Sequence, residues 1–223
     1  MRNHHYLQIS FNSSLEEAEY IINSIPPSDR ILIEVGTPLI KQHGIHSIRA
    51  ITTLWQQRLF ANGIITPAYI VADLKCMDRA STEVQLAHAG GASAAVVLGQ
   101  APVETLNAFI QKCVESKIDS MIDMMNVEKP YNVMRQLKTL PTVVMLHRGV
   151  DETNFSDKPL PIHMINKVKG TYNVKIAIAG GDTSREIQSA VFNGADIVVV
   201  WKDFYTISEE TTEIVTNFLN QVK

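Results

Sequence analysis

The sequence is poor in the features that mark secreted, membrane and zinc-binding proteins. It has only two cysteines, Cys76 and Cys113, without the pairing expected of a disulfide framework or a zinc site, so we expect both to be reduced thiols. No apolar stretch approaches the roughly 20 residues needed to cross a bilayer. The first residues, Met1 to His5, lack the apolar segment and cleavage site of a signal peptide. We therefore expect a cytoplasmic protein without membrane contact.

Basic clusters and a dinucleotide-binding motif are also missing. The net charge is −3 and no run of Lys and Arg is present, whereas nucleic-acid binding normally needs a basic stripe. No G-x-G-x-x-G motif follows the first predicted strand, which argues against a dinucleotide site. The 45% hydrophobic and 19% charged content is that of a globular protein, and small anionic ligands remain compatible with it.

Short β-branched runs alternate with longer segments of helical periodicity eight times along the chain, as a parallel sheet with crossover helices requires. The predicted strands are residues 6–10, 31–34, 69–73, 94–98, 120–124, 143–147, 175–179 and 197–200. The predicted helices are residues 15–23, 45–60, 80–89, 103–117, 130–137, 160–168, 183–192 and 208–222. Ser14 and Glu17 predict a capping box at the first of these helices.

Eight units favour a closed (β/α)8 barrel over an open doubly wound sheet, because closure removes both exposed edges. No linker, repeat or charge run divides the chain, so we expect a single α/β domain over residues 1–223. The open sheet is the alternative.

Polar residues recur where the predicted strands end. In a barrel of this kind the reacting groups lie at these carboxyl ends and in the loops that follow. The series along the chain is Asn12, Glu34, Asp73, Lys75, Asp78, Asp123, His147, Gly180, Gly181, Trp201 and Lys202.

A single carboxylate at such a position usually caps a helix or pairs with a lysine. Glu34 and Asp73, however, end neighbouring strands, and together they suit a hard divalent cation with oxygen ligands. Lys75 lies two residues beyond Asp73 and is expected on the same side. The joint pattern therefore predicts a charged site at the barrel mouth.

Two further positions each have a structural and a functional interpretation. His147 could be a buried, hydrogen-bonded histidine, but its place at the end of a predicted strand favours proton transfer near neutral pH. Gly180 and Gly181 could form only a tight turn, or they could present backbone N–H groups to a phosphate at a helix start.

Two segments carry a family resemblance. E-V-G-T-P-L-I-K, starting at Glu34, and A-D-L-K-C-M-D, ending at Asp78, resemble the 3-hexulose-6-phosphate synthases and 3-keto-L-gulonate-6-phosphate decarboxylases of the orotidine-5′-monophosphate decarboxylase superfamily. The resemblance extends from Leu7 to about Val200, and the D-x-K-x-x-D core in this context is specific.

The resemblance implies a dimeric barrel that binds Mg²⁺ through Glu34 and Asp73 and stabilises an enediolate intermediate. It also implies that Lys75 contacts substrate oxygens, that His147 transfers a proton, and that Asp78 acts in the partner's active site. The substrate would be a sugar phosphate, with Asn12, Asp123, Gly180, Gly181 and Lys202 as further substrate-binding candidates.

Two features favour the synthase branch, in which the enediolate of ribulose 5-phosphate adds to formaldehyde. E-V-G-T-P-L-I is closer to the synthases, and Val150 stands where the decarboxylases carry a second arginine after the histidine. The chain also departs from the family at three places: Asn12 replaces an aspartate, Arg79 replaces a small residue, and Trp201-Lys202 replace a Gly-Arg or Gly-Gly pair.

These departures keep three hypotheses open. The first is an aldehyde-lyase of the hexulose-phosphate synthase type. The second is a related enediolate-forming lyase or decarboxylase with another substrate. The third is a non-catalytic, ligand-binding barrel, for which Asn12 is the best argument.

Overall fold

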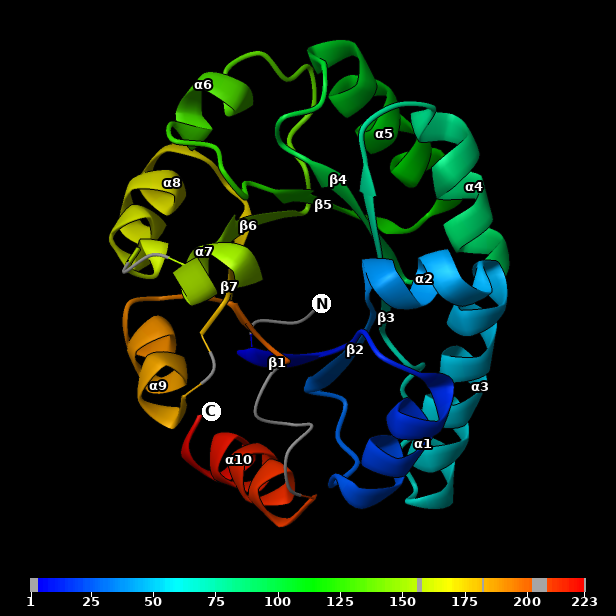
Figure 1. Ribbon diagram of the computed structural model, residues 1–223. Coiled ribbons are helices and arrows are strands. Elements are labelled where there is room, and N and C mark those ends of the chain that lie inside the picture. The colour runs from blue at the N-terminus through cyan, green and yellow to red at the C-terminus, as the bar shows by residue number, and fades with distance from the viewer. Residues whose placement is uncertain (1–3, 156–157, 182, 202–207, 223) are drawn as a thin grey trace.

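The computed structural model describes residues 4–155, 158–181, 183–201 and 208–222. They form a closed barrel in which each strand is parallel to its two neighbours and the last strand pairs with the first (Figure 1). The strands are β1 (Tyr6–Phe11), β2 (Ile31–Val35), β3 (Ile70–Cys76), β4 (Ala94–Leu98), β5 (Asp119–Asp123), β6 (Val143–His147), β7 (Lys175–Ala179) and β8 (Ile197–Val200). The predicted (β/α)8 barrel is therefore confirmed, and the open doubly wound sheet is excluded.

The helices lie outside the ring of strands, most of them around its side and a few at one end (Figure 1). They are α1 (Leu15–Ser24), α2 (Thr37–His43), α3 (Ile45–Ala61), α4 (Ala80–Gly90), α5 (Val103–Ser116), α6 (Pro130–Met134), α7 (Val150–Phe155), the 3₁₀ helix η1 (Pro161–Met164), α8 (Ile165–Thr171), α9 (Ser184–Phe192) and α10 (Ser208–Gln221). None of the described helices is both long enough and apolar enough to cross a membrane.

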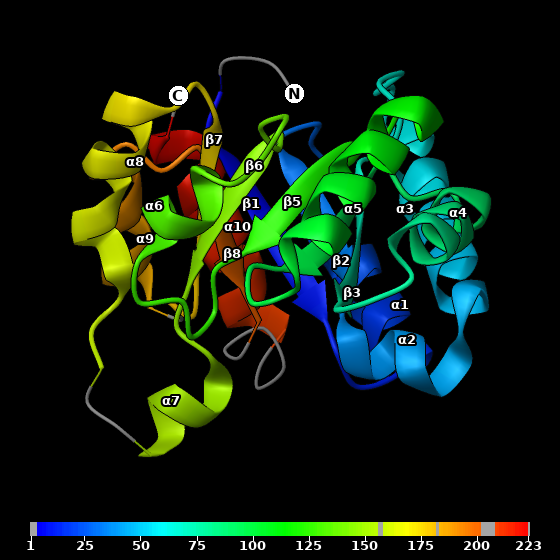
Figure 2. The same cartoon turned by 90° about the horizontal axis from the view of Figure 1, so that it is seen from above.

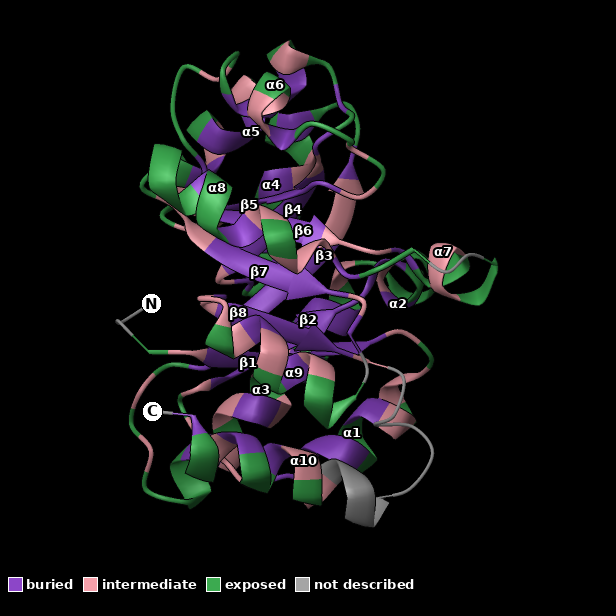
Figure 3. Cartoon of the chain, turned by 90° about the vertical axis from the view of Figure 1, so that its left-hand side faces the viewer, coloured by how far each residue is buried: buried purple, intermediate pink, exposed green. Residues whose placement is uncertain are grey.

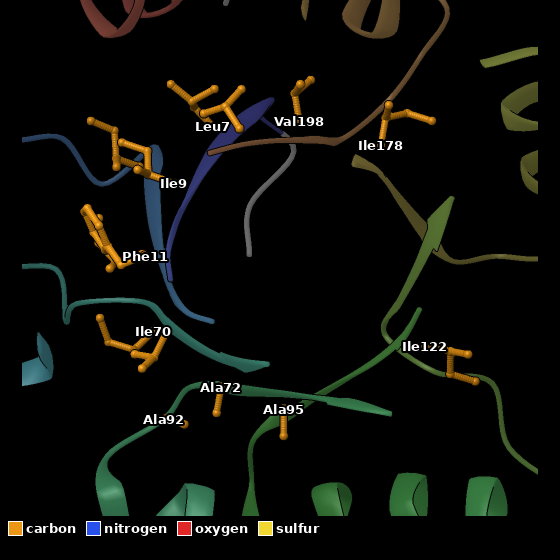
Figure 4. Packing of buried hydrophobic residues seen from close by; sticks show 14 of the residues in the cluster. Leu7, Ile9, Phe11, Ile70, Ala72, Ala92, Ala95, Ile122, Ile178 and Val198 are labelled. Carbon is orange, nitrogen blue, oxygen red and sulfur yellow. The ribbon is translucent and has the colours of Figure 1, made fainter. Parts of the chain in front are cut away.

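Alternation along each strand sorts the side chains into two layers. On β1, Leu7, Ile9 and Phe11 face the helices and belong to the larger apolar cluster, whereas Tyr6 belongs to the smaller cluster inside the barrel. Figure 4 shows outward-facing side chains of this larger cluster around the ring of strands. The strands are buried, and exposed residues gather on the outer faces of the helices and in the loops (Figure 3).

Most element boundaries lie within a few residues of the predicted ones, and the differences have local causes. The Ser14 hydroxyl accepts the Glu17 backbone N–H at 3.2 Å, as predicted, while a fully reciprocal capping box forms at α9 between Thr183 and Glu186. The predicted helix 160–168 is instead a 3₁₀ turn followed by α8. Both cysteines are free thiols and buried.

Two short helices, α2 and α7, were not predicted. Both follow strand ends, after β2 and β6, and each is too short to show a hydrophobic stripe. They lie at the same end of the barrel, and α7 projects outward from it (Figures 2 and 3). The chain enters β1 and leaves α10 at the opposite end in both views.

Candidate active site

A cavity of about 350 Å³ opens at the carboxyl ends of the strands. Its size is in the range of small-molecule sites. Its walls are made by inward-facing residues near the ends of β1, β2, β3, β6, β7 and β8 together with parts of α2 and α7. The lining residues are Ser10, Asn12, Glu34, Thr37, Pro38, Asp73, Lys75, Met145, His147, Arg148, Val150, Thr153, Asn154, Ala179, Gly180, Val199 and Trp201.

Glu34 is held by the neighbouring strand β1. Its Oε1 accepts the Ser10 hydroxyl at 2.5 Å, and its Oε2 accepts the Gln8 side-chain amide. Burial, and next the Asp73 carboxylate, raise the pKa of Glu34 to about 7. A negative charge on Glu34 is therefore costly in the absence of a further cationic partner.

Among the described residues, the Asp73 carboxylate has a side-chain partner at only one of its two oxygens. Its Oδ2 is 2.9 Å from the Lys75 ammonium, whereas its buried Oδ1 has no hydrogen-bond partner among the described residues. The Thr37 hydroxyl, at the start of α2, donates to the Asp73 backbone carbonyl at 2.7 Å and fixes the strand end. An orphaned buried carboxylate oxygen is unusual and marks a place for a cation or a donor.

Lys75 faces the cavity because β3 is irregular at this point. The register with β4 shifts between Ala72 and Cys76, and Lys75 itself has a positive φ of 44°. Such a backbone conformation is costly for a residue with a Cβ and recurs at functional sites. The irregularity directs the ammonium toward Asp73 and toward Asp123, whose Oδ2 lies 3.0 Å from Nζ.

Asp123 has 0% exposed surface and lies behind Lys75 and His147, outside the cavity wall. Its Oδ1 accepts the Met125 backbone N–H at 2.9 Å. Burial alone would raise the pKa of Asp123, but His147 and Lys75 outweigh burial and lower it to about 2. Asp123 was expected to contact the substrate, and in the structure it contacts Lys75 and His147, which line the cavity.

His147 ends β6 and shares the Asp123 carboxylate. Its Nδ1 is 2.8 Å from Asp123 Oδ2 and 3.0 Å from Oδ1. This contact occupies Nδ1 and leaves Nε2 as the nitrogen that can exchange a proton with a ligand.

Burial lowers the pKa of Lys75, but Asp73, Asp123 and Glu34 together outweigh burial and raise it well above its ordinary value, so the ammonium stays charged.

Asn12 follows β1 and lines the same cavity. Its Nδ2 donates to the Ser10 hydroxyl at 3.1 Å. A Cβ at Gly36 would come within 2.0 Å of Asn12 Oδ1, so only glycine at position 36 leaves room for this side chain.

Gly180 is on the cavity wall, and Gly181 is buried beside it and off the wall. Gly180 has a φ of 92°, and a Cβ there would be 2.1 Å from the Arg148 backbone oxygen. The Arg148 guanidinium donates to the Gly180 carbonyl and pairs with Glu186 of α9 at 3.3 Å. Of the two predicted glycines, Gly180 is therefore the one that lines the cavity in the part of the chain that the structure describes.

One predicted site residue, Asp78, is not brought together with the others in its own chain. Asp78 is exposed and lies off the wall of the cavity in its own chain, where its backbone carbonyl accepts the Cys76 thiol. Lys202 lies outside the described residues. Trp201, which precedes it, lines the cavity as its inward position at the end of β8 implies.

Sequence reasoning missed the partners of the charged residues. Gln8 and Ser10 alternate with Leu7, Ile9 and Phe11, so polar residues facing inward could have been found from the period of two on β1. Arg148, and the α7 residues Thr153 and Asn154, carry no such periodic pattern. Their place in the wall depends on how the loop after β6 folds.

The described residues contain no group of three or more His, Cys, Asp or Glu side chains arranged to hold a metal. Two carboxylates nevertheless fit Mg²⁺, which keeps several waters and often uses only one or two protein carboxylates together with substrate oxygens. The unpartnered Asp73 Oδ1 and the raised pKa of Glu34 are both features that a nearby cation would relieve.

Comparison with known proteins identifies the family. Residues 5–201 match the family described as orotidine 5′-phosphate decarboxylase / HUMPS. The chain belongs to this family.

Sequence relatives of this family member include the bifunctional enzyme Fae/Hps of Methanothrix thermoacetophila, which is 36% identical over 219 residues. That match covers 98% of the chain and 53% of the relative. The bifunctional enzyme Fae/Hps of Methanocella arvoryzae is also 36% identical, over 87% of the chain and 48% of the relative. The chain thus spans about half the length of the curated relatives that it matches.

Among solved structures, a 3-hexulose-6-phosphate synthase from Salmonella typhimurium superposes with a TM-score of 0.77 at 25% identity. The match covers 95% of this family member and 99% of that chain. The expected resemblance to the synthase and decarboxylase group is confirmed by these comparisons.

Proposed function

We propose that the chain is a Mg²⁺-dependent aldehyde-lyase of the 3-hexulose-6-phosphate synthase type. The reaction is a reversible aldol addition in which the enediolate of ribulose 5-phosphate attacks formaldehyde. One observation carries the proposal: a charged Lys75 and a histidine share the buried Asp123 carboxylate at the edge of a cavity that also holds two further carboxylates. The Fae/Hps relatives and the Salmonella synthase support the same activity.

The chain's own residues fit the demands of enediolate formation. Removal of a proton next to a carbonyl leaves negative charge on two adjacent oxygens, and a preorganised cation stabilises that charge. Lys75 provides such a cation from a strained, fixed backbone position. His147 can take a proton or return one through Nε2, since Asp123 holds Nδ1.

Glu34 and Asp73 would hold the Mg²⁺ ion, which would act as a Lewis acid on the developing enediolate. Their place on the adjacent strands β2 and β3 supports this assignment, because β2 pairs with β3 up to Val35 and Ala72. The Gln8 and Ser10 donors keep Glu34 in one orientation.

The phosphate end of the substrate would lie near Gly180 and Trp201. Gly180 lines this part of the cavity, where its missing Cβ makes room for the Arg148 carbonyl, and Trp201 also lies on the wall. The proposed homodimer has shared sites, with Asp78 of each chain serving its partner's cavity. The exposure of Asp78 in its own chain supports this assignment.

Trp201 also favours a second candidate function. An indole beside the expected phosphate site suits a substrate whose anionic end is bound in another way, and the enediolate chemistry of Lys75 and His147 would be kept. This candidate is a related lyase or decarboxylase acting on a different substrate.

The proposed function is tested by incubating the purified protein with ribulose 5-phosphate, formaldehyde and Mg²⁺ and measuring formaldehyde consumption. We expect turnover that requires all three components and that falls at least about 100-fold in Lys75→Met. The exposed Lys41 gives a matched control, Lys41→Met, which should keep its activity.

The cation is tested separately by calorimetric titration of Mg²⁺ into the wild type and Asp73→Ala. Loss of one of two protein ligands should weaken binding at least about tenfold. Equal affinity would refute the cation site. Mg²⁺ binding without any turnover of the phosphosugar would favour the second candidate.

A further inference from the structure

Strand β1 carries polar side chains that hold Glu34 without taking part in the proposed chemical steps themselves. Ser10 stands opposite Glu34 in the register of β1 with β2. The Ser10 hydroxyl donates to Glu34 Oε1 at 2.5 Å, and Gln8 donates to Oε2. Because Glu34 is buried, these two donors take the place that water has around an exposed carboxylate.

The direction of the Ser10 hydroxyl is set by Asn12. The Asn12 amide nitrogen is 3.1 Å from Ser10 Oγ, and an amide nitrogen can only donate. The Ser10 oxygen therefore accepts from Asn12, which leaves its single proton for Glu34. Gly36 completes the arrangement, because any side chain there would displace the Asn12 amide.

We propose that Ser10 and Asn12 are paired positioning residues that form a one-way hydrogen-bond relay onto Glu34. An ionised aspartate at position 12 could only accept hydrogen bonds, so it would compete with Glu34 for the one Ser10 proton. The relay thus gives a physical reason for asparagine at a position where the resembled family has aspartate. Asn12 acts through Ser10 on the orientation of Glu34.

The pairing is tested first in the metal-free protein by a double-mutant cycle. Urea unfolding is measured for the wild type, Ser10→Ala, Asn12→Asp and the double variant. Asn12→Asp replaces the donor to Ser10 with a competing acceptor, and this change can act through Ser10 only where Ser10 is present. We expect it to lower the urea midpoint by on the order of 0.5 M with Ser10 and by clearly less with Ala at position 10.

A second cycle uses Asn12→Ala, which removes the donor without adding a charge. It keeps the test decisive if the aspartate variant fails to fold. The relay would be overturned if, in a cycle whose variants fold, the Asn12 substitution shifts the urea midpoint equally with Ser10 and with Ala at position 10.

The second readout is the affinity for Mg²⁺ alone, and this arm rests on the proposed function. We expect Ser10→Ala to weaken Mg²⁺ binding about tenfold, as loss of an outer hydrogen-bond partner does at other metal sites, and Ser10→Thr to restore it by keeping the hydroxyl. Unchanged Mg²⁺ affinity in Ser10→Ala would overturn the positioning role. A wild type that binds no Mg²⁺ but shows coupling in the urea cycle would support the relay and refute the cation part of the proposed function.

Discussion

Asp123 joins the two groups that the proposed chemistry needs. One buried carboxylate accepts from Lys75, from His147 and from the Met125 backbone, so it fixes the Lys75 ammonium and the histidine ring relative to each other. The pKa of Asp123, lowered to about 2, keeps this carboxylate ionised at every pH at which the enzyme would work.

We predict that Asp123→Asn lowers kcat at least about 100-fold, because an amide neither stabilises a protonated histidine nor holds Lys75 as strongly. The KM should change much less, since Asp123 lies off the cavity wall. Steady-state measurement of kcat and KM checks this prediction. The matched control is Asp29→Asn, because Asp29 is exposed. Comparable losses in both variants would contradict the assigned role.

The raised pKa of Glu34 predicts an unusual dependence of stability on pH in the metal-free protein. Its folded-state pKa of about 7 exceeds its ordinary value of 4.5, so between these values the folded state binds more protons than the unfolded state. Stability from this group therefore rises as the pH falls from about 8 toward 4.5, by up to about 3 kcal/mol.

Urea unfolding in a chelating buffer between pH 5 and 8 measures this effect. The comparison is with Glu34→Gln, which cannot titrate and should lack this part of the slope. Identical pH dependence in the two proteins would show that Glu34 has an ordinary pKa.

At the scale of elements, the end of β7 depends on a backbone conformation available to glycine. Gly180 combines a φ of 92° with an approach to the Arg148 carbonyl that leaves no room for a Cβ. Beside it, the Arg148 backbone N–H donates to the Ala179 carbonyl at 3.1 Å and joins the ends of β6 and β7, next to where α7 begins.

We predict that Gly180→Ala destabilises the fold by at least about 2 kcal/mol through strain and steric conflict. Gly170, in α8, provides the opposite case, because a Cβ there meets nothing within 4 Å. Gly170→Ala should be neutral or stabilising by up to about 1 kcal/mol. Thermal or urea unfolding of the two variants should therefore give shifts of different size, and equal destabilisation would contradict this account.

Elements with strong sequence periodicity were predictable, whereas features that depend on tertiary contacts were not. All eight strands follow from their apolar, β-branched runs, and β4, β6, β7 and β8 have the predicted bounds. The predicted third strand stopped at Asp73, three residues early, because the irregularity that extends β3 to Cys76 has no local pattern. Residues at strand ends were likewise found by position, whereas the burial of Asp123 behind Lys75 follows only from the packed barrel.

At the scale of the whole molecule, one barrel supplies the described cavity, but Asp78 lies outside it. We predict a homodimer in which Asp78 completes the partner's site. Mixing inactive Lys75→Ala and Asp78→Ala proteins should restore about a quarter of wild-type activity, because half of the dimers would be mixed and each would hold one intact site.

The control for this experiment is each variant incubated alone under the same exchange conditions. Light scattering gives the oligomeric state independently. A fully active monomer, or mixtures that recover no activity although subunits exchange, would contradict shared sites.

The start of β1 and the end of α10 lie at one end of the barrel, whereas α2 and α7, which contribute to the cavity wall, lie at the other (Figure 2). A polypeptide joined before β1 or after α10 would emerge at the end of the barrel away from the entrance used by a ligand. Tags, surface tethers or fused modules at either end should therefore leave ligand access open. In an immobilised or fused form, the length of the linker would set how far the fused module can reach. It would have little effect on ligand access to this cavity.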